Sequence, residues 1–159
     1  MSIFKKSKQA PAIEDVINAR LMGEAKRNAL YFVAFMRENG FSLEGFHTRN
    51  ETWWNLDYRG EGIGCVKISD EFMFWLGHRC FDNSGGSVDD ELKEFTWAHV
   101  VICPQETCKP PYCEGDNHSK NRWQVFGKEY ESTCHAPMGF FNPDANDFEN
   151  IKKLLLRLK

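Results

Sequence analysis

Apolar residues recur at helical spacing in the N-terminal part of the chain. A short stretch begins after Pro11, a residue that suits the first turn of a helix. A longer stretch covers residues 24–39 and ends before Gly40, which can adopt the left-handed conformation of a C-terminal cap. We therefore predict helices here, with an apolar stripe in the second formed by Ala25, Ala29, Phe32, Val33 and Met36.

From Thr52 onward the pattern changes to an alternation of period two. Trp54 and Leu56 fall on one face of a predicted strand, and Asn55 and Asp57 fall on the other. Two further apolar stretches, residues 63–69 and 72–81, are separated by short turns rich in glycine or acidic residues. These stretches predict an antiparallel β-meander whose third strand is central and covered on both faces.

The C-terminal half predicts a helix, a Cys-rich segment, a strand and a final helix. Ser87 or Asp89 can cap the middle helix, and residues 122–132 form the predicted strand. Asn142 and Pro143 are suited to the N-cap and first position of the last helix. We therefore predict an α+β fold: an antiparallel β-meander sheet packed with N-terminal, middle and C-terminal helices, plus a Cys-rich metal-binding loop.

Composition and charge narrow the class of protein. The 159 residues are 42% hydrophobic, which is ordinary for one globular domain, so we expect a single domain over residues 1–159 with residues 1–11 flexible. The formal net charge of -3 argues against a nucleic-acid partner. No apolar stretch follows the lysine-rich start as in a signal peptide, and none reaches membrane-spanning length. We expect a cytoplasmic protein without a membrane partner.

The segment CPQETCKPPYCEGDNHSK carries the clearest candidate chemistry. Cys103, Cys108, Cys113 and His118 follow one another at a fixed step, with four residues between neighbours. The cytoplasm keeps thiols reduced, so clustered cysteines there favour a metal site over a disulfide framework. Zinc prefers four ligands in a tetrahedron and binds thiolates well. We therefore predict a structural zinc site within residues 103–134.

The fourth ligand has two candidates. His118 continues the fixed step, whereas Cys134 comes from a separate segment and would let the metal contribute more folding free energy. We prefer the set Cys103, Cys108, Cys113 and Cys134. The spacing differs from the close C-x2-C pair of most zinc knuckles, so a reduced, metal-free loop remains the alternative.

The other cysteines and histidines give weaker indications. Cys65 and Cys80 fall in predicted strands and are expected to be small core residues. Cys134 and His135 are adjacent, but neighbours in an extended chain point to opposite faces, which disfavours a nucleophile and base pair. His99 lies among apolar residues of a helix and is expected to be a core histidine.

These observations favour a zinc-stabilised cytoplasmic binding or regulatory module over an enzyme. Its partner would be a small molecule or a protein that the sequence does not identify. The alternative is a small enzyme or a thiol-based redox sensor that uses the same cysteines. A closed four-thiolate site leaves no open coordination position for catalysis, whereas a sensor needs an exposed thiolate of low pKa.

Overall fold

The computed structural model describes residues 10–47, 51–81, 87–102, 122–131 and 133–159. The expectations for residues 1–9 and for residues 103–121 of the Cys-rich segment therefore lie outside the described residues. The elements are α1 (Ile13–Arg20), α2 (Gly23–Glu38), β1 (Phe41–His47), β2 (Thr52–Tyr58), β3 (Glu61–Ile68), β4 (Phe72–Leu76), the 3-10 helix η1 (His78–Cys80), α3 (Asp90–Ala98), β5 (Val100–Ile102), β6 (Arg122–Val125), β7 (Lys128–Glu131), β8 (Thr133–Phe141) and α4 (Ala145–Leu156).

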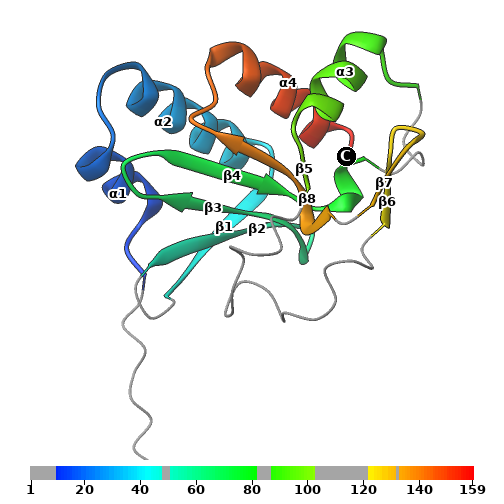
Figure 1. Cartoon of the computed structure of the whole chain (residues 1–159). Helices are drawn as coiled ribbons and strands as arrows, with labels where there is room; N and C mark the ends of the chain where they lie inside the picture. The colour runs from blue at the N-terminus through cyan, green and yellow to red at the C-terminus, as the bar shows by residue number, and fades with distance from the viewer. Residues whose placement is uncertain (1–9, 48–50, 82–86, 103–121, 132) are drawn as a thin grey trace, which may run out of the picture.

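The main sheet has six strands in the order β1-β2-β3-β4-β8-β5, and every neighbouring pair is antiparallel. Strands β1 to β4 form a continuous meander, and β8 is inserted between β4 and β5. The four α-helices of the described residues lie on one face of this sheet (Figure 1). The α+β class and the antiparallel meander are thus confirmed.

The core lies between the helices and the covered face of the sheet. Phe32 of α2 is fully buried, and its ring centroid is 5.3 Å from that of Phe74 in β4 and 4.6 Å from that of Phe148 in α4. Leu56 of β2 and Met138 of β8 are also fully buried. Close contact of large apolar side chains from both layers is the main favourable term in a domain of this size.

The predicted helix-end residues are confirmed for α2 and α3 and are wrong for the start of α4. Gly40 follows α2 with a φ of 82°, and the Asp89 side chain accepts a hydrogen bond from the Leu92 amide at the start of α3. Asp144, not Asn142, caps α4 through a reciprocal capping box with Asp147, so the first residue of the helix is Ala145 and not Pro143. Asn142 instead adopts a φ of 46°, and its side chain and backbone both bond to Phe72.

The predicted strand over residues 122–132 is wrong, because this region is the β6–β7 hairpin. Phe126 and Gly127 connect its strands with φ values of 46° and 84°, the left-handed pair of a tight hairpin turn. Phenylalanine is unusual there, but Phe126 is only 7% exposed and packs edge-on against Phe81. Burial of the ring offsets the backbone cost of its conformation.

The sheet is also larger than predicted, because β1, β5 and β8 add to the expected meander. The predicted third strand ends at Leu76 rather than Phe81, and Cys80 is buried in η1 instead of lying in a strand. Strand β4 is interior, as expected. The helices cover only one of its faces, however, and Met73 and Trp75 on the other are only half-buried.

Gly64 in β3 offers a test of this packing, because a Cβ atom there would overlap the backbone carbonyl oxygen of Trp75 in β4. Backbone cannot move aside as a flexible side chain can. We expect Gly64→Ala to lower the free energy of unfolding by about 1–3 kcal/mol, measured by urea denaturation.

Gly62 in the same strand is the matched control. A Cβ atom there would lie 3.5 Å from Oδ1 of Asp57, an ordinary contact. Gly62→Ala should change the free energy of unfolding by no more than about 0.5 kcal/mol. Equal effects of the two substitutions would contradict the described register of β3 and β4.

Candidate functional site

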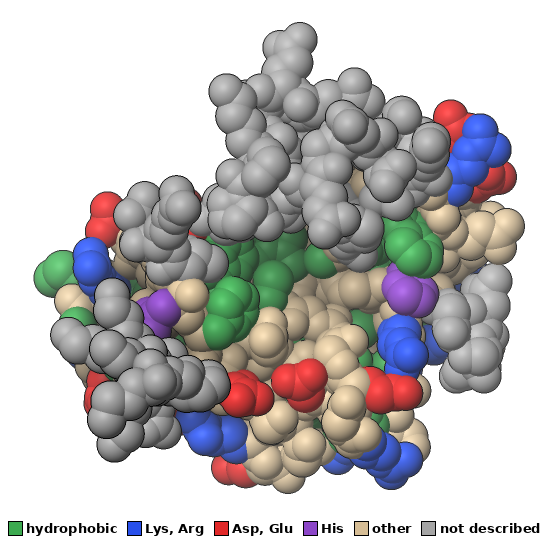
Figure 2. All heavy atoms as spheres, turned by 90° about the horizontal axis from the view of Figure 1, so that it is seen from below, with side chains coloured by type: hydrophobic (Ala, Val, Ile, Leu, Met, Phe, Trp, Pro, Cys, Tyr) green, Lys and Arg blue, Asp and Glu red, His purple; other side chains and the backbone are tan. Residues whose placement is uncertain are grey.

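The face of the sheet opposite the helices carries a row of large side chains. Strand register places Phe46, Trp53, Lys67, Met73 and Phe141 side by side across β1, β2, β3, β4 and β8. Their sequence neighbours, such as Trp54 and Phe140, point into the core because side chains alternate along a strand. We call this surface the uncovered face, because none of the described helices lies over it. Figure 2 shows hydrophobic side chains gathered on it, with acidic side chains beside them.

Two tryptophans pack together at the centre of the uncovered face. Trp53 of β2 and Trp75 of β4 have ring centroids 5.3 Å apart and planes inclined by 36°. Strand β3 separates β2 from β4, so the two indoles meet above it. Cys65 of β3 pairs with Trp75 in the register and therefore lies beneath this pair. Burial raises the pKa of the Cys65 thiol to about 11.

Lys67 completes the central packing. Its ammonium group lies 5.3 Å from the Trp53 ring centroid and forms an ion pair with Glu51. A lysine can place its aliphatic stem along apolar surface and keep its charged end near a carboxylate. Lys67 therefore adds apolar area to the uncovered face, and its positive charge is neutralised by Glu51.

Glycine makes room for the second tryptophan. A Cβ atom at Gly139 of β8 would lie 3.2 Å from Nε1 of Trp75 and 2.9 Å from Cγ2 of Val101 in β5. The Trp75 indole consequently extends over β8, where its ring meets Phe141 edge-on at a centroid distance of 5.8 Å. The aromatic contact is thus continuous from β2 to β8.

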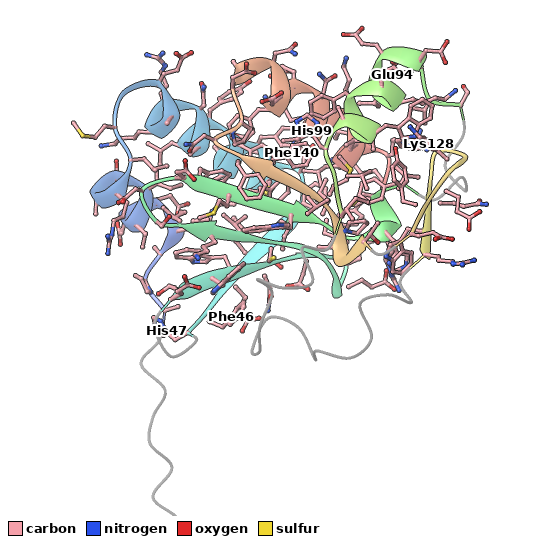
Figure 3. The ribbon with its side chains drawn as sticks, viewed as in Figure 1. Phe46, His47, Glu94, His99, Lys128 and Phe140 are labelled. Carbon is pink, nitrogen blue, oxygen red and sulfur yellow. The ribbon has the colours of Figure 1, made fainter. Side chains whose placement is uncertain are left out.

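The two ends of the row remain open to solvent. Phe46 is 38% exposed in β1, and Phe141 is 56% exposed in β8. Figure 3 shows Phe46 on the side of the sheet away from Glu94 of α3. Exposed aromatic side chains that flank a packed aromatic centre are typical of a surface that binds a partner.

Acidic side chains border the row near β1 and β2. Glu44 pairs with Asn55, and Ser42 pairs with Asp57, so both carboxylates lie on the uncovered face. Neither acid forms an ion pair within the part of the chain that the structure describes. The described strands of this face thus carry two unpaired acids, while their lysine is already paired.

The predicted metal ligands lie almost entirely outside the described residues. Cys103, Cys108, Cys113 and His118 fall in residues 103–121, and of Cys134 only the backbone, in β8, is described. Within the described ranges, no group of three or more His, Cys, Asp or Glu residues is placed to hold a metal ion. The zinc site therefore stays a prediction.

The backbone does bring the two ends of the Cys-rich segment to one place in the sheet. Ile102, the last residue of β5, pairs with Thr133, the first residue of β8. Cys103 follows Ile102 in the chain, and Cys134 follows Thr133. The sequence predicts that Cys134 comes from a segment separate from the Cys-rich loop, and its backbone belongs to β8.

The described histidines are each engaged in packing or hydrogen bonding. His99 lies between Phe95 and Phe140, and its Nδ1 is 2.8 Å from the Phe95 carbonyl oxygen. It packs among apolar residues as expected, but it follows α3 as the C-cap and is only half-buried. His47 Nδ1 lies 3.0 Å from Thr52 Oγ1. His78 stacks on Trp123 at a centroid distance of 4.3 Å. The sequence pattern indicates no role for His47 and His78, and it does not indicate the uncovered face.

The raised pKa of Cys65 predicts slow alkylation. With a pKa of about 11, roughly one molecule in a thousand carries the Cys65 thiolate at pH 8, whereas a thiol of ordinary pKa 9.0 would be about one-tenth ionised. We expect iodoacetamide to modify Cys65 about 100-fold more slowly than a cysteine in a short unstructured peptide. Site-resolved mass spectrometry measures both rates.

The raised pKa of Cys65 also determines the direction in which pH changes the stability of the fold. The folded state holds the Cys65 proton more tightly than the unfolded state, so this contribution to stability is complete below pH 9 and is lost as pH rises toward 11. The alkylation rate should rise throughout that interval. A rate that levels off near pH 8 would contradict the described burial of the thiol.

No described helix is both long enough and apolar enough to cross a lipid bilayer. Comparison of the chain with protein-family models, with curated proteins and with solved structures finds no match. Among the described residues, the uncovered face is the surface whose chemistry is best defined.

Proposed function

We propose that this chain is a zinc-stabilised cytoplasmic module that binds a partner through the uncovered face of its sheet. The observation that carries the proposal is the continuous aromatic contact from Trp53 through Trp75 to Phe141. Surfaces used for binding combine packed aromatic anchors with a polar border, and the uncovered face has both. Phe46 and Phe141 supply accessible apolar area, while Glu44 and Asp57 supply the polar border.

The same surface supports binding better than catalysis. A thiol nucleophile needs a low pKa and a nearby base, whereas burial raises the pKa of Cys65. Lys67 is engaged by Glu51 and the Trp53 ring. The alternative of a small enzyme or redox sensor would thus depend on the cysteines of residues 103–134 rather than on Cys65.

The zinc part of the proposal rests on spacing and on strand pairing. Cys103, Cys108 and Cys113 recur at a fixed step, and the Ile102–Thr133 pair brings the start of the segment beside the residue that precedes Cys134. A zinc ion bound by Cys103, Cys108, Cys113 and Cys134 would tie β5 to β8. Four thiolates would leave no open position for a reacting group, so the metal would be structural.

We expect protein purified without added zinc to contain about one zinc per chain. Cys108→Ser should lose the metal, and Cys65→Ser should retain it, because Cys65 lies under the two tryptophans. Cys134→Ala should weaken zinc binding by more than about 100-fold, since loss of a direct ligand costs more than loss of a supporting hydrogen bond. Elemental analysis and competitive chelator titration provide these measurements.

His118→Ala is the variant that decides the fourth ligand. Its zinc affinity should remain close to that of the native chain. Loss of affinity in His118→Ala alone would make the histidine the fourth ligand, and metal-free protein with native disulfides would overturn the zinc proposal.

Phe141, the more exposed end of the row on the uncovered face, should account for most binding of a neutral apolar dye. We call the aromatic side chains of this face, Phe46, Trp53, Trp75 and Phe141, the aromatic row. Nile red becomes fluorescent on contact with apolar surface, and Phe141 is 56% exposed beside Trp75. We expect Phe141→Ser to lose most of the fluorescence enhancement seen with the native chain. The far-ultraviolet circular dichroism spectrum should be unchanged.

Leu156→Ser is the matched control, because Leu156 is 42% exposed on α4, in the helical layer. This variant should retain the enhancement. If both variants lose it equally, the uncovered face is not the preferred apolar surface and the proposed binding role fails.

A further inference from the structure

We propose that the uncovered face binds an extended, positively charged peptide segment of a partner protein. This inference rests on the proposed binding function and adds the chemistry of the partner. Three properties of the face support it: the length of the aromatic row, the sign of its unpaired charge and the way that Lys67 is held.

The length of the row favours a peptide over a small molecule. Phe46 and Phe141 stand at its two ends, with β2, β3 and β4 between their strands. Four strand spacings of about 4.8 Å separate them by about 19 Å. An extended peptide of about six residues spans that distance at roughly 3.3 Å per residue. A single small ligand would reach only one of the two exposed rings.

The charge of the face favours a cationic partner. Glu44 and Asp57 have no ion-pair partner in the described part of the chain, and Lys67 is neutralised by Glu51. A nucleic acid would bring phosphates toward these carboxylates, which is repulsive. A second copy of this chain would bring the same two acids and the same paired lysine. A lysine-bearing or arginine-bearing segment supplies the missing charge.

Lys67 illustrates how such a partner would be held. Its ammonium group contacts the Trp53 ring and pairs with Glu51. Phe46 and Glu44 also offer an aromatic ring and a carboxylate, at the exposed end of the row in β1. The two residues lie two positions apart and therefore on one face of the strand. A partner lysine can therefore repeat this arrangement there, and alternate apolar residues of an extended peptide can meet the aromatic row.

The test uses two synthetic six-residue peptides, acetylated and amidated, one alternating lysine with leucine and the other alternating glutamate with leucine. We expect the native chain to bind the lysine peptide at least about tenfold more tightly by isothermal titration calorimetry. Glu44→Gln combined with Asp57→Asn should weaken lysine-peptide binding by about five- to tenfold, because exposed ion pairs contribute modestly. Added salt should reduce binding of the native chain more than binding of this double variant.

Glu91→Gln combined with Glu94→Gln is the matched control. This double variant removes the same charge from exposed positions of α3, on the helical side of the sheet, and should bind the lysine peptide as the native chain does. Equal loss in the two double variants would show nonspecific attraction and overturn the proposal. So would equal binding of both peptides, or no binding of either. If one of these outcomes occurs while Nile red binding still depends on Phe141, the proposal of a cationic peptide is rejected. The proposed binding of a partner through the uncovered face would then still stand.

Discussion

The described helices cover only one face of the sheet. The side chains on the other face can therefore be shielded from water only by something other than a described helix. Strand geometry sends every second side chain to each face. Leu76, Phe74 and Met138 take the covered face and are completely buried beneath the helical layer. The side chains of the second face have no described helix above them. Among the described residues, Trp53, Trp75 and Phe141 pack against one another, and this contact reduces their exposure to water.

This lateral packing explains the choice of residues on the uncovered face. Trp53 and Trp75 are large enough to meet across β3, and Gly139 lets the second indole extend over β8. Cys65 pairs with Trp75 in the register, and burial of its thiol raises the pKa to about 11. At the ends of the row no further aromatic side chain follows among the described strands, so Phe46 and Phe141 stay exposed. The exposed ends are thus a consequence of the same geometry that buries the centre.

Sequence patterns predicted the local elements better than the sheet that joins them. Helices α2 and α4 and strands β2 and β3 have clear periodicity, which depends only on neighbouring residues. Strand β8 contains Pro137 and Gly139 and pairs with β4 and β5, which are distant in sequence. Strand β5 has only three residues, and Phe126 lacks the usual chemistry of a tight turn. The uncovered face is built from cross-strand register, so without β1 and β8 it could not be predicted.

The weakest edge of the sheet is also where the Cys-rich segment leaves it. Strand β5 joins β8 through a register shift and a very short ladder, so few backbone hydrogen bonds hold it. The chain then runs from Cys103 through the β6–β7 hairpin before it returns at Thr133, and closing so long an excursion costs conformational entropy. Val100 at the start of β5 packs against the core, but Ile102 at its end is 54% exposed, so hydrophobic burial offsets little of that cost where the segment leaves the sheet. A cross-link between residues that flank the Ile102–Thr133 pair would act at the point where hydrophobic burial is least. The proposed zinc site and the hydrophobic core would therefore stabilise different parts of the same sheet.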